Sequence, residues 1–227
     1  MKKPYIVCHM MTSLDGRIDC NMTSKLPGVD AYYETLDSFD FTATLSGRVT
    51  AELEMAEPGA FEPKHYEPFG TMSFSKKADA DEYSVVTDTK GSLLWKDGTY
   101  DGTSLIIVTS EAVSKEYIDY LDEREISWIA CGKEHIDLVK ASQILADEFG
   151  IKRMGIVGGG TINTAFLNAG LLDEISIVMA PGIDARKGMV TVFDGLPADS
   201  EPIPLTLENI KKYDSGAVWL QYRTTSV

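Results

Sequence analysis

Short apolar, β-branched segments alternate with helical patterns along most of this chain. Strand-like segments such as Tyr5–Met11, Leu105–Thr109 and Met154–Val157 are separated by stretches whose apolar residues recur at intervals of three and four. Such alternation is typical of an α/β fold, in which strands share a sheet and helices cover its faces. The other strands predicted on this basis are Ala43–Ser46, Ser84–Thr87, Trp128–Ala130, Ile175–Met179, Leu205–Ile210 and Val218–Tyr222.

Two segments carry the clearest helical signals. Asp137–Phe149 places its apolar residues on one stripe and is followed by Gly150, a residue that suits the left-handed end of a helix. Ser114–Arg124 begins with a capping serine and ends with a cation that suits the negative end of the helix dipole. Weaker patterns predict helices over Val29–Phe39, Val49–Ala56 and Thr161–Ala169.

One long segment, Glu57–Asp81, is rich in proline and glycine and shows little periodicity. Unstructured segments of this length serve as binding lids or are plain insertions, and we favour an insertion. Nothing else in the 227 residues resembles an interdomain linker or an internal repeat, so we predict one domain over residues 1–227.

The acidic balance of the chain limits its partners. Asp and Glu number 35 and Lys and Arg number 21, which gives a formal net charge of −14. Because nucleic-acid binding depends mainly on cationic contacts to phosphates, we expect no nucleic-acid partner. No apolar run approaches the ~20 residues that cross a bilayer, so we expect no membrane span.

The cysteines bear on the compartment and on metal binding. Cys8, Cys20 and Cys131 are odd in number and far apart, which favours reduced thiols and a cytoplasmic location over a disulfide framework. Cys8 precedes His9, but consecutive residues of a strand point to opposite faces. We therefore expect no metal site, and we interpret the pair as a buried thiol and a hydrogen-bonded imidazole.

The most distinctive motif joins the strand Met154–Val157 to a helix through Gly158, Gly159 and Gly160, followed by Thr161. Consecutive glycines permit close backbone approach or backbone angles denied to other residues. A helix that starts just beyond them directs free N–H groups at that place, as phosphate binding requires, and Thr161 can cap the helix or bind the anion. The spacing matches neither the dinucleotide fingerprint nor the P-loop, and a tight turn needed only for packing explains the motif about equally well.

Two other segments place polar residues at strand ends. Gly47, Arg48 and Thr50 follow one predicted strand, and the guanidinium of arginine suits a phosphate. Thr12–Asp19 follows the first strand and carries Asp15 and an arginine, although Asp-Gly alone is an ordinary turn dipeptide.

In their order and spacing, these three segments resemble the dihydrofolate-reductase-like superfamily, and within it the reductase domain of the riboflavin-biosynthesis deaminase/reductase family. The resemblance extends from Tyr5 to about Asp194. It implies a central mixed, mostly parallel sheet flanked by helices. It also implies an NADPH-dependent reductase of a pyrimidine or pterin-like heterocycle, with 5-amino-6-(5-phosphoribosylamino)uracil as the favoured substrate, and a homodimer paired through strand edges in the C-terminal half.

The resemblance further implies roles for individual residues. The glycine turn would hold the cofactor pyrophosphate, commonly with a cis Gly-Gly bond, and the arginine segment would approach the 2′-phosphate and pyrophosphate. Other residues would lie near the adenosine ribose or its phosphate, or beside the nicotinamide ring, and three carboxylates are candidate proton donors. The glycine turn comprises Gly158, Gly159, Gly160 and Thr161, and the arginine segment comprises Gly47, Arg48 and Thr50. The residues near the ribose are Thr109 and Ser110, and those beside the nicotinamide are Thr12 and Ser13. The candidate proton donors are Asp15, Asp30 and Glu34.

The chain also departs from the family it resembles. Val157 stands where the riboflavin reductases normally have a glutamate, and Ala51–Pro58 replaces their Asp-Asp-Pro-x-Leu-x-Arg segment. A sugar-phosphate substrate thereby loses two expected contacts. Two alternatives therefore stay open, namely dihydrofolate reductase activity and a non-catalytic NADPH-binding sensor protein.

Overall fold

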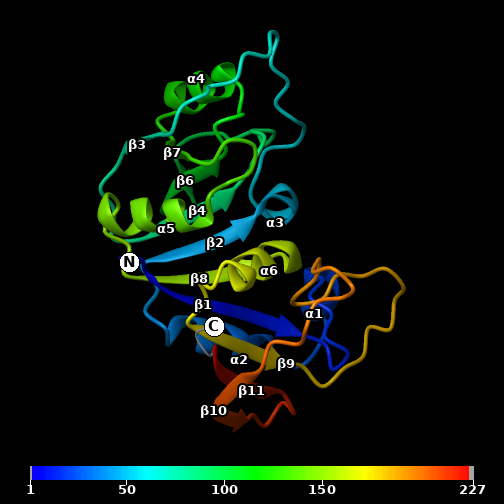
Figure 1. Ribbon diagram of the computed structural model, residues 1–227. Helices are drawn as coiled ribbons and strands as arrows, with labels where there is room; N and C mark the ends of the chain where they lie inside the picture. The colour runs from blue at the N-terminus through cyan, green and yellow to red at the C-terminus, as the bar shows by residue number, and fades with distance from the viewer. Residues whose placement is uncertain (1, 225–227) are drawn as a thin grey trace. The chain divides into compact units, whose positions relative to one another are not determined.

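The computed structural model describes residues 2–224 (Figure 1). The chain divides into two compact units. Unit 1 contains Thr42–Met154 together with the N-terminal residues up to Pro4, and unit 2 contains Tyr5–Phe41 and the chain from Gly155 onward. The single domain over residues 1–227 stays a prediction.

Unit 1 is built on parallel strands in the order β2-β4-β6-β7. Two short strands pair with this sheet in antiparallel orientation: β3 pairs with β7, and β5 pairs with β6. Strand β4 is buried along its whole length, as expected where helices cover both faces of a parallel sheet. The strands of unit 1 are β2 (Ala43–Gly47), β3 (Ser73–Ser75), β4 (Tyr83–Thr87), β5 (Thr99–Tyr100), β6 (Thr103–Thr109) and β7 (Ser127–Ala130).

The helices of unit 1 begin where the sequence places their caps. Ser114 accepts a hydrogen bond from the backbone N–H of Tyr117, and Asp137 accepts one from Lys140, so each satisfies an N–H that the helix itself leaves free. Gly150 has a φ of 70°, the left-handed conformation expected after a helix. The helices are α3 (Arg48–Glu54), α4 (Lys115–Glu123) and α5 (Leu138–Asp147).

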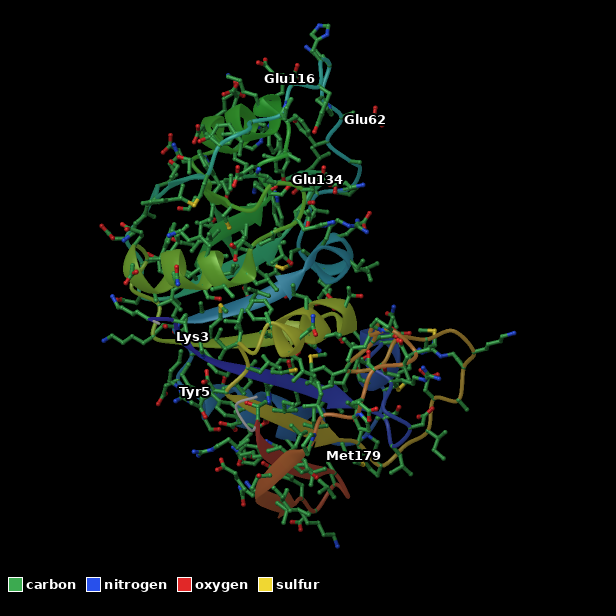
Figure 2. All side chains as sticks on the ribbon, viewed as in Figure 1. Lys3, Tyr5, Glu62, Glu116, Glu134 and Met179 are labelled. Atoms are coloured by element: carbon green, nitrogen blue, oxygen red, sulfur yellow. The ribbon has the colours of Figure 1, made fainter. Side chains whose placement is uncertain are left out.

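The segment 57–81 contains only the short strand β3 and is docked on the rest of unit 1. The Glu116 carboxylate on α4 accepts hydrogen bonds from the backbone N–H groups of Lys64 (2.7 Å) and His65 (3.0 Å), and Figure 2 shows its position beside this segment. The Phe61 ring lies 5.0 Å from that of Tyr117, measured between centroids. These contacts favour a packed insertion over a lid.

Unit 2 has the strand order β10-β11-β9-β1-β8. β1 and β9 are parallel and in register from Val7 opposite Glu174 to Thr12 opposite Met179, whereas β11 and β10 join as antiparallel strands. With unit 1, this confirms the predicted mixed, mostly parallel sheet flanked by helices. The elements of unit 2 are β1 (Tyr5–Thr12), α1 (Cys20–Thr23), α2 (Val29–Asp37), β8 (Arg153–Gly158), α6 (Gly160–Asn168), β9 (Glu174–Met179), β10 (Leu205–Lys212) and β11 (Val218–Thr224).

Every predicted strand and helix is present, with bounds that differ by up to two residues. The elements that the sequence does not predict are α1, β3 and β5, which are too short to show a hydrophobic period. Across residues 2–224 no helix is long and apolar enough to span a membrane. Cys8, Cys20 and Cys131 form no disulfide among the described residues, and the cytoplasmic location stays a prediction.

His9 lies in the core of unit 2 and has no exposed surface. Its Nδ1 is 2.9 Å from Ser176 Oγ, and its Nε2 is 3.3 Å from both the Tyr32 carbonyl oxygen and Thr35 Oγ1. The imidazole is thus hydrogen-bonded, as predicted. Burial lowers the pKa of His9 to about 4, because removal from water disfavours the charged imidazolium.

Acid should therefore destabilise the fold through His9. Because its folded-state pKa lies below the ordinary 6.5, the contribution of His9 to stability is complete above pH 6.5 and is lost as the pH falls toward 4. The full loss is roughly 3 kcal/mol. We expect the free energy of unfolding of His9→Gln, measured by urea denaturation, to depend less on pH between about pH 7 and pH 4.5 than that of wild type.

The exposed His65 supplies the control, since His65→Gln should keep the wild-type pH dependence. Identical pH slopes for wild type and His9→Gln would contradict the expectation.

Candidate functional site

Most of the predicted cofactor-binding residues lie at or just beyond strand ends within each unit. In unit 1, Gly47 ends β2 and Thr109 ends β6. In unit 2, Thr12 ends β1 and Gly158 ends β8. Ligand sites of open α/β sheets form beyond the carboxyl ends of the strands, so these positions suit binding residues.

The glycine turn of unit 2 starts helix α6. Gly159 is the N-cap residue with φ 99° and ψ 116°, a conformation that favours glycine. The first backbone hydrogen bond of the helix runs from Asn163 N to Gly159 O (3.1 Å), so the earlier N–H groups of the first turn have no partner within the helix. Thr161 is exposed in that turn. It is not the cap, and of its two predicted roles only anion binding stays a prediction.

The expectation of a cis Gly-Gly bond is wrong, because none of the peptide bonds among the described residues is cis. A cis bond outside proline costs about 3–4 kcal/mol. The positive φ of Gly159 turns the chain into α6 with a trans bond instead.

Packing explains a second glycine of the turn. A Cβ atom on Gly160 would lie 2.2 Å from the carbonyl oxygen of Thr191, which belongs to the connection between β9 and β10. The same connection is bound to α6 by a hydrogen bond from Asn163 Nδ2 to Val192 O (2.8 Å). Gly160 is therefore required for packing, whatever the turn binds.

The Gly47–Thr50 segment forms the start of α3 in unit 1. Gly47 is its N-cap and Thr50 lies in its first turn. The Arg48 guanidinium is half exposed and pairs with Glu52, with 2.6 Å between Nη1 and Oε2. Such surface pairs contribute little free energy, so the guanidinium can exchange this partner for a phosphate.

Thr109 and Ser110 are both buried at the end of β6. Both hydroxyls donate to the Thr89 carbonyl oxygen, at 3.1 Å and 2.9 Å, and so tie β6 to the turn after β4. That turn is shaped by the buried Asp88 and ends in the exposed Lys90. No sequence pattern singles out Lys90; its position three residues beyond a predicted strand is the only signal.

The turn after β1 uses its own polar groups. Thr12 and Ser13 are buried. Ser13 Oγ donates to Asp15 Oδ1 (2.6 Å) and accepts from the N–H of Arg17 (3.1 Å), while Ser13 N donates to Arg17 O (3.0 Å). The hydroxyl proton of Ser13 is therefore used in a hydrogen bond within the turn.

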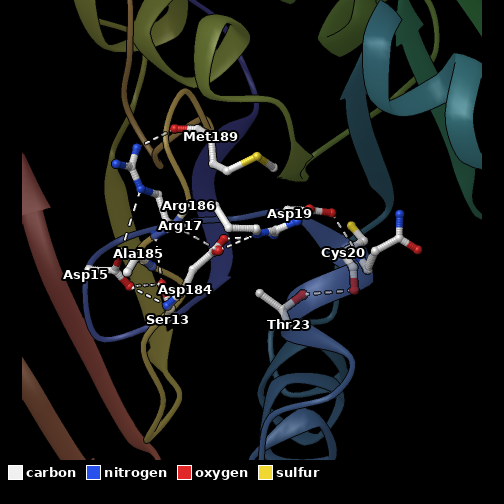
Figure 3. A network of polar contacts seen from close by, with 11 residues as sticks. Ser13, Asp15, Arg17, Asp19, Cys20, Thr23, Asp184, Ala185, Arg186 and Met189 are labelled. Atoms are coloured by element: carbon white, nitrogen blue, oxygen red, sulfur yellow. Dashed lines mark hydrogen bonds and ion pairs between the residues drawn. The ribbon is translucent and has the colours of Figure 1, made fainter.

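Asp15 is held as an acceptor. Besides the Ser13 hydroxyl, its carboxylate accepts hydrogen bonds from the backbone N–H groups of Asp184 and Ala185, both at 3.0 Å (Figure 3). These bonds favour the ionised carboxylate and lower the pKa of Asp15, with the Ser13 bond as the largest cause. This geometry favours a structural role over proton donation.

The other two predicted proton donors lie on α2. Asp30 and Glu34 are both exposed, and Glu34 pairs with Lys211 at 2.9 Å. General acids are usually enclosed in surroundings that raise their pKa. The fold thus gives neither carboxylate an enclosed position, and their catalytic role stays a prediction.

Comparison with known proteins supplies the family. The model of the RibD C-terminal domain matches residues 4–219. The chain belongs to the RibD C-terminal domain family. This membership confirms the resemblance seen in the sequence.

One curated relative within reach of sequence comparison is the 2,5-diamino-6-ribosylamino-4(3H)-pyrimidinone 5′-phosphate reductase of Methanothermobacter thermautotrophicus. It is 29% identical over 116 residues, which cover 51% of this chain and 53% of that protein. The match thus spans about half the length of each.

Solved structures share the fold of the RibD C-terminal domain over nearly the whole chain. A pyrimidine reductase-like protein from Corynebacterium diphtheriae aligns with a TM-score of 0.72 at 17% identity, covering 98% of this chain and 92% of that one. The riboflavin biosynthesis reductase Rib7 of Saccharomyces cerevisiae aligns with a TM-score of 0.63 at 17% identity, covering 98% and 90%. At these identities the structures establish the fold alone.

The packing of Gly160 can be tested without any ligand. We expect Gly160→Ala to lower the free energy of unfolding by roughly 1–3 kcal/mol, because the new methyl group collides with the Thr191 carbonyl. Gly170→Ala, at the other end of α6, is the control. It meets open space and carries only the cost of a positive φ, about 1 kcal/mol. Equal destabilisation of the two variants, measured by urea denaturation, would contradict the packing role.

Proposed function

We propose that this protein is an NADPH-dependent reductase of a ribosylamino-pyrimidine 5′-phosphate. Membership of the RibD C-terminal domain family and the named activity of the Methanothermobacter relative support this reaction. The observation that carries the proposal is the Gly159 turn at the start of α6, where N–H groups without a partner inside the helix suit a phosphate.

The residues of the turn fit a dinucleotide pyrophosphate. The positive end of the α6 dipole and the N–H groups of its first turn attract an anion, and the exposed Thr161 adds a hydroxyl. These local dipoles offset the repulsion expected from a chain of net charge −14. We propose that Gly158, Gly159, Gly160 and Thr161 form the pyrophosphate site.

Cations of unit 1 suit the extra phosphate of NADPH. We propose that Arg48 binds the 2′-phosphate, since its guanidinium offers paired donors and its partner Glu52 is an exposed surface carboxylate. Gly47 and Thr50 would approach the pyrophosphate from the same helix start, and Lys90 is a second candidate cation at a strand end. Thr109 and Ser110 would lie near the adenosine ribose.

Hydride transfer requires positioning more than side-chain chemistry. NADPH supplies the hydride when bound, and the protein holds the nicotinamide against the carbon–nitrogen double bond of the substrate. We propose that Thr12 and Ser13 lie beside the nicotinamide and that Asp30 or Glu34 supplies the proton. Because Val157 stands in place of the glutamate of related reductases, other residues would have to contact the sugar phosphate.

We also propose that the protein is a homodimer joined through β10. This strand pairs with β11 on one side, and all eight of its residues are exposed. Leu207 is 50% and Ile210 62% exposed. A hollow of about 370 Å³, lined by Phe193, Leu196 and other apolar residues, lies next to Leu205. Unpaired apolar edge strands of this kind are normally covered by a partner.

The cofactor assignment predicts a selective effect of Arg48→Ala. Loss of a charge-assisted pair should weaken NADPH binding about 10- to 100-fold and change NADH binding by no more than about twofold. Intrinsic fluorescence or calorimetry measures both affinities, with the exposed Lys152→Ala as control. Equal weakening of NADPH and NADH would remove Arg48 from the 2′-phosphate site.

The activity itself is tested by the loss of NADPH absorbance with candidate substrates. We expect oxidation with the ribosylamino-pyrimidine 5′-phosphate and none with dihydrofolate. Oxidation with dihydrofolate alone would support the dihydrofolate reductase alternative, and tight binding without oxidation would support a sensor. No NADPH binding at millimolar concentration would overturn the proposed function.

The dimer predicts that a charge on β10 separates the subunits. We expect wild type to be a dimer by light scattering and Ile210→Asp to be a monomer, because a buried carboxylate destabilises an apolar interface. Leu53 on α3 is 78% exposed, and Leu53→Asp, as control, should stay dimeric. A monomeric wild type would contradict the proposal.

A further inference from the structure

Two segments of unit 2 leave from neighbouring strand ends. β1 and β9 are parallel, with Thr12 opposite Met179, so the turn after β1 and the connection after β9 start side by side. The connection runs from Ala180 to Pro204 without a helix or named strand. Long irregular segments keep one conformation only where other groups hold their backbone.

Asp15 provides such a hold on both segments. Within its own turn it accepts the Ser13 hydroxyl at 2.6 Å. Across to the connection it accepts the N–H groups of Asp184 and Ala185 at 3.0 Å, and the adjacent Leu14 N donates to Gly182 O at 2.7 Å. Three donors from two segments thus converge on one carboxylate (Figure 3).

The backbone at Ala185 depends on this carboxylate. Ala185 has a φ of 54°, a left-handed conformation that is unfavourable for a residue with a Cβ atom. A strained conformation persists only where surrounding contacts impose it. The bond from Ala185 N to Asp15 Oδ2 is such a contact.

Ion pairs reinforce the hold but do not replace it. The Arg186 guanidinium pairs with Asp184 and, at 2.7 Å, with Asp19, and Arg17 donates to the Met189 carbonyl. Arg186 is half exposed, so solvent screens its ion pairs. Asp15 differs because it fixes backbone N–H groups directly.

We infer that Asp15 is a positioning residue of the proposed reductase: by joining the turn after β1 to the start of the β9–β10 connection, it fixes the Thr12–Ser13 backbone against which the nicotinamide ring is to lie. The inference rests on the proposed function. Hydride transfer is sensitive to small displacements of the reacting carbon, so loss of this hold lowers the rate of the chemical step.

Proton donation by Asp15 would require a different arrangement. A carboxylic acid that gives up a proton needs the neutral form, whereas every hydrogen bond at Asp15 stabilises the ionised form. The nearest cation is the Arg17 guanidinium, with 3.9 Å between Nε and Asp15 Oδ2, and it acts in the same direction. The Asp184 carboxylate repels that of Asp15, but it is paired with Arg186.

Asp15→Asn tests the inference, because the amide keeps the size of the side chain but cannot accept all three bonds. Hydrogen exchange should become faster at the Asp184 and Ala185 amides, which lose their acceptor. We expect kcat to fall about 100-fold while the pH profile of kcat keeps its shape. Binding of 2′,5′-ADP, which lacks the nicotinamide, should stay within about twofold of wild type.

The control is Asp214→Asn, an exposed carboxylate in the turn between β10 and β11 that should change none of these readouts. Wild-type kcat in Asp15→Asn would overturn the inference and leave the proposed function intact. Loss of one limb of the pH profile would make Asp15 the proton donor and would also overturn it. A wild type that binds no NADPH would overturn the proposed function. Hydrogen exchange needs no cofactor, so its result at Asp184 and Ala185 is independent of that outcome.

A second variant covers the case in which Asp15→Asn does not fold. Asp15→Glu keeps the charge and moves the carboxylate by one methylene group. The hydrogen bonds from the Asp184 and Ala185 N–H groups should therefore be distorted, while a carboxyl group is still present. We expect a smaller fall in kcat with the wild-type pH profile. A glutamate variant as fast as wild type would show that the position of the carboxylate is unimportant and would overturn the inference.

Discussion

The parallel pairing of β1 with β9 is the constraint on which the rest of unit 2 depends. Its register brings Thr12 opposite Met179, so two segments far apart in the chain leave the sheet as neighbours. Each strand is buried along most of its length, so a shift of one residue would exchange the side chains that pack against the two faces of the sheet. The position of every polar group in the following turns depends on that register.

The glycine turn shows how one motif meets two physical demands. Gly159 is glycine because its φ of 99° is denied to other residues, and Gly160 is glycine because the Thr191 carbonyl leaves no space for a Cβ atom. Backbone conformation and packing thus account for both glycines, and ligand binding at this turn stays a proposal. The N–H groups of the first turn of α6 have no partner within the helix, which is what an anion site at a helix start requires.

The strands and helices were within reach of sequence reasoning, because periodicity and caps are local. Ser114 and Asp137 cap the helices that follow them, and Gly150 ends one of them as its residue type predicts. The candidate site was predictable only in part. The strand-end positions of the binding residues were predicted, but the hydrogen bonds of Asp15 depend on a connection that lies far away in the sequence.

By itself the sequence determined the α/β class, the places of the strands and helices and the family, because these follow from local hydrophobic period, capping residues and the order of motifs. Only the tertiary structure decided how polar groups are used. It made Asp15 an acceptor for three donors, buried His9 among hydrogen-bonding partners and packed Gly160 on a carbonyl. The physical reason is that hydrogen bonds and close contacts depend on distances of a few ångströms between residues remote in the chain, which no local pattern encodes.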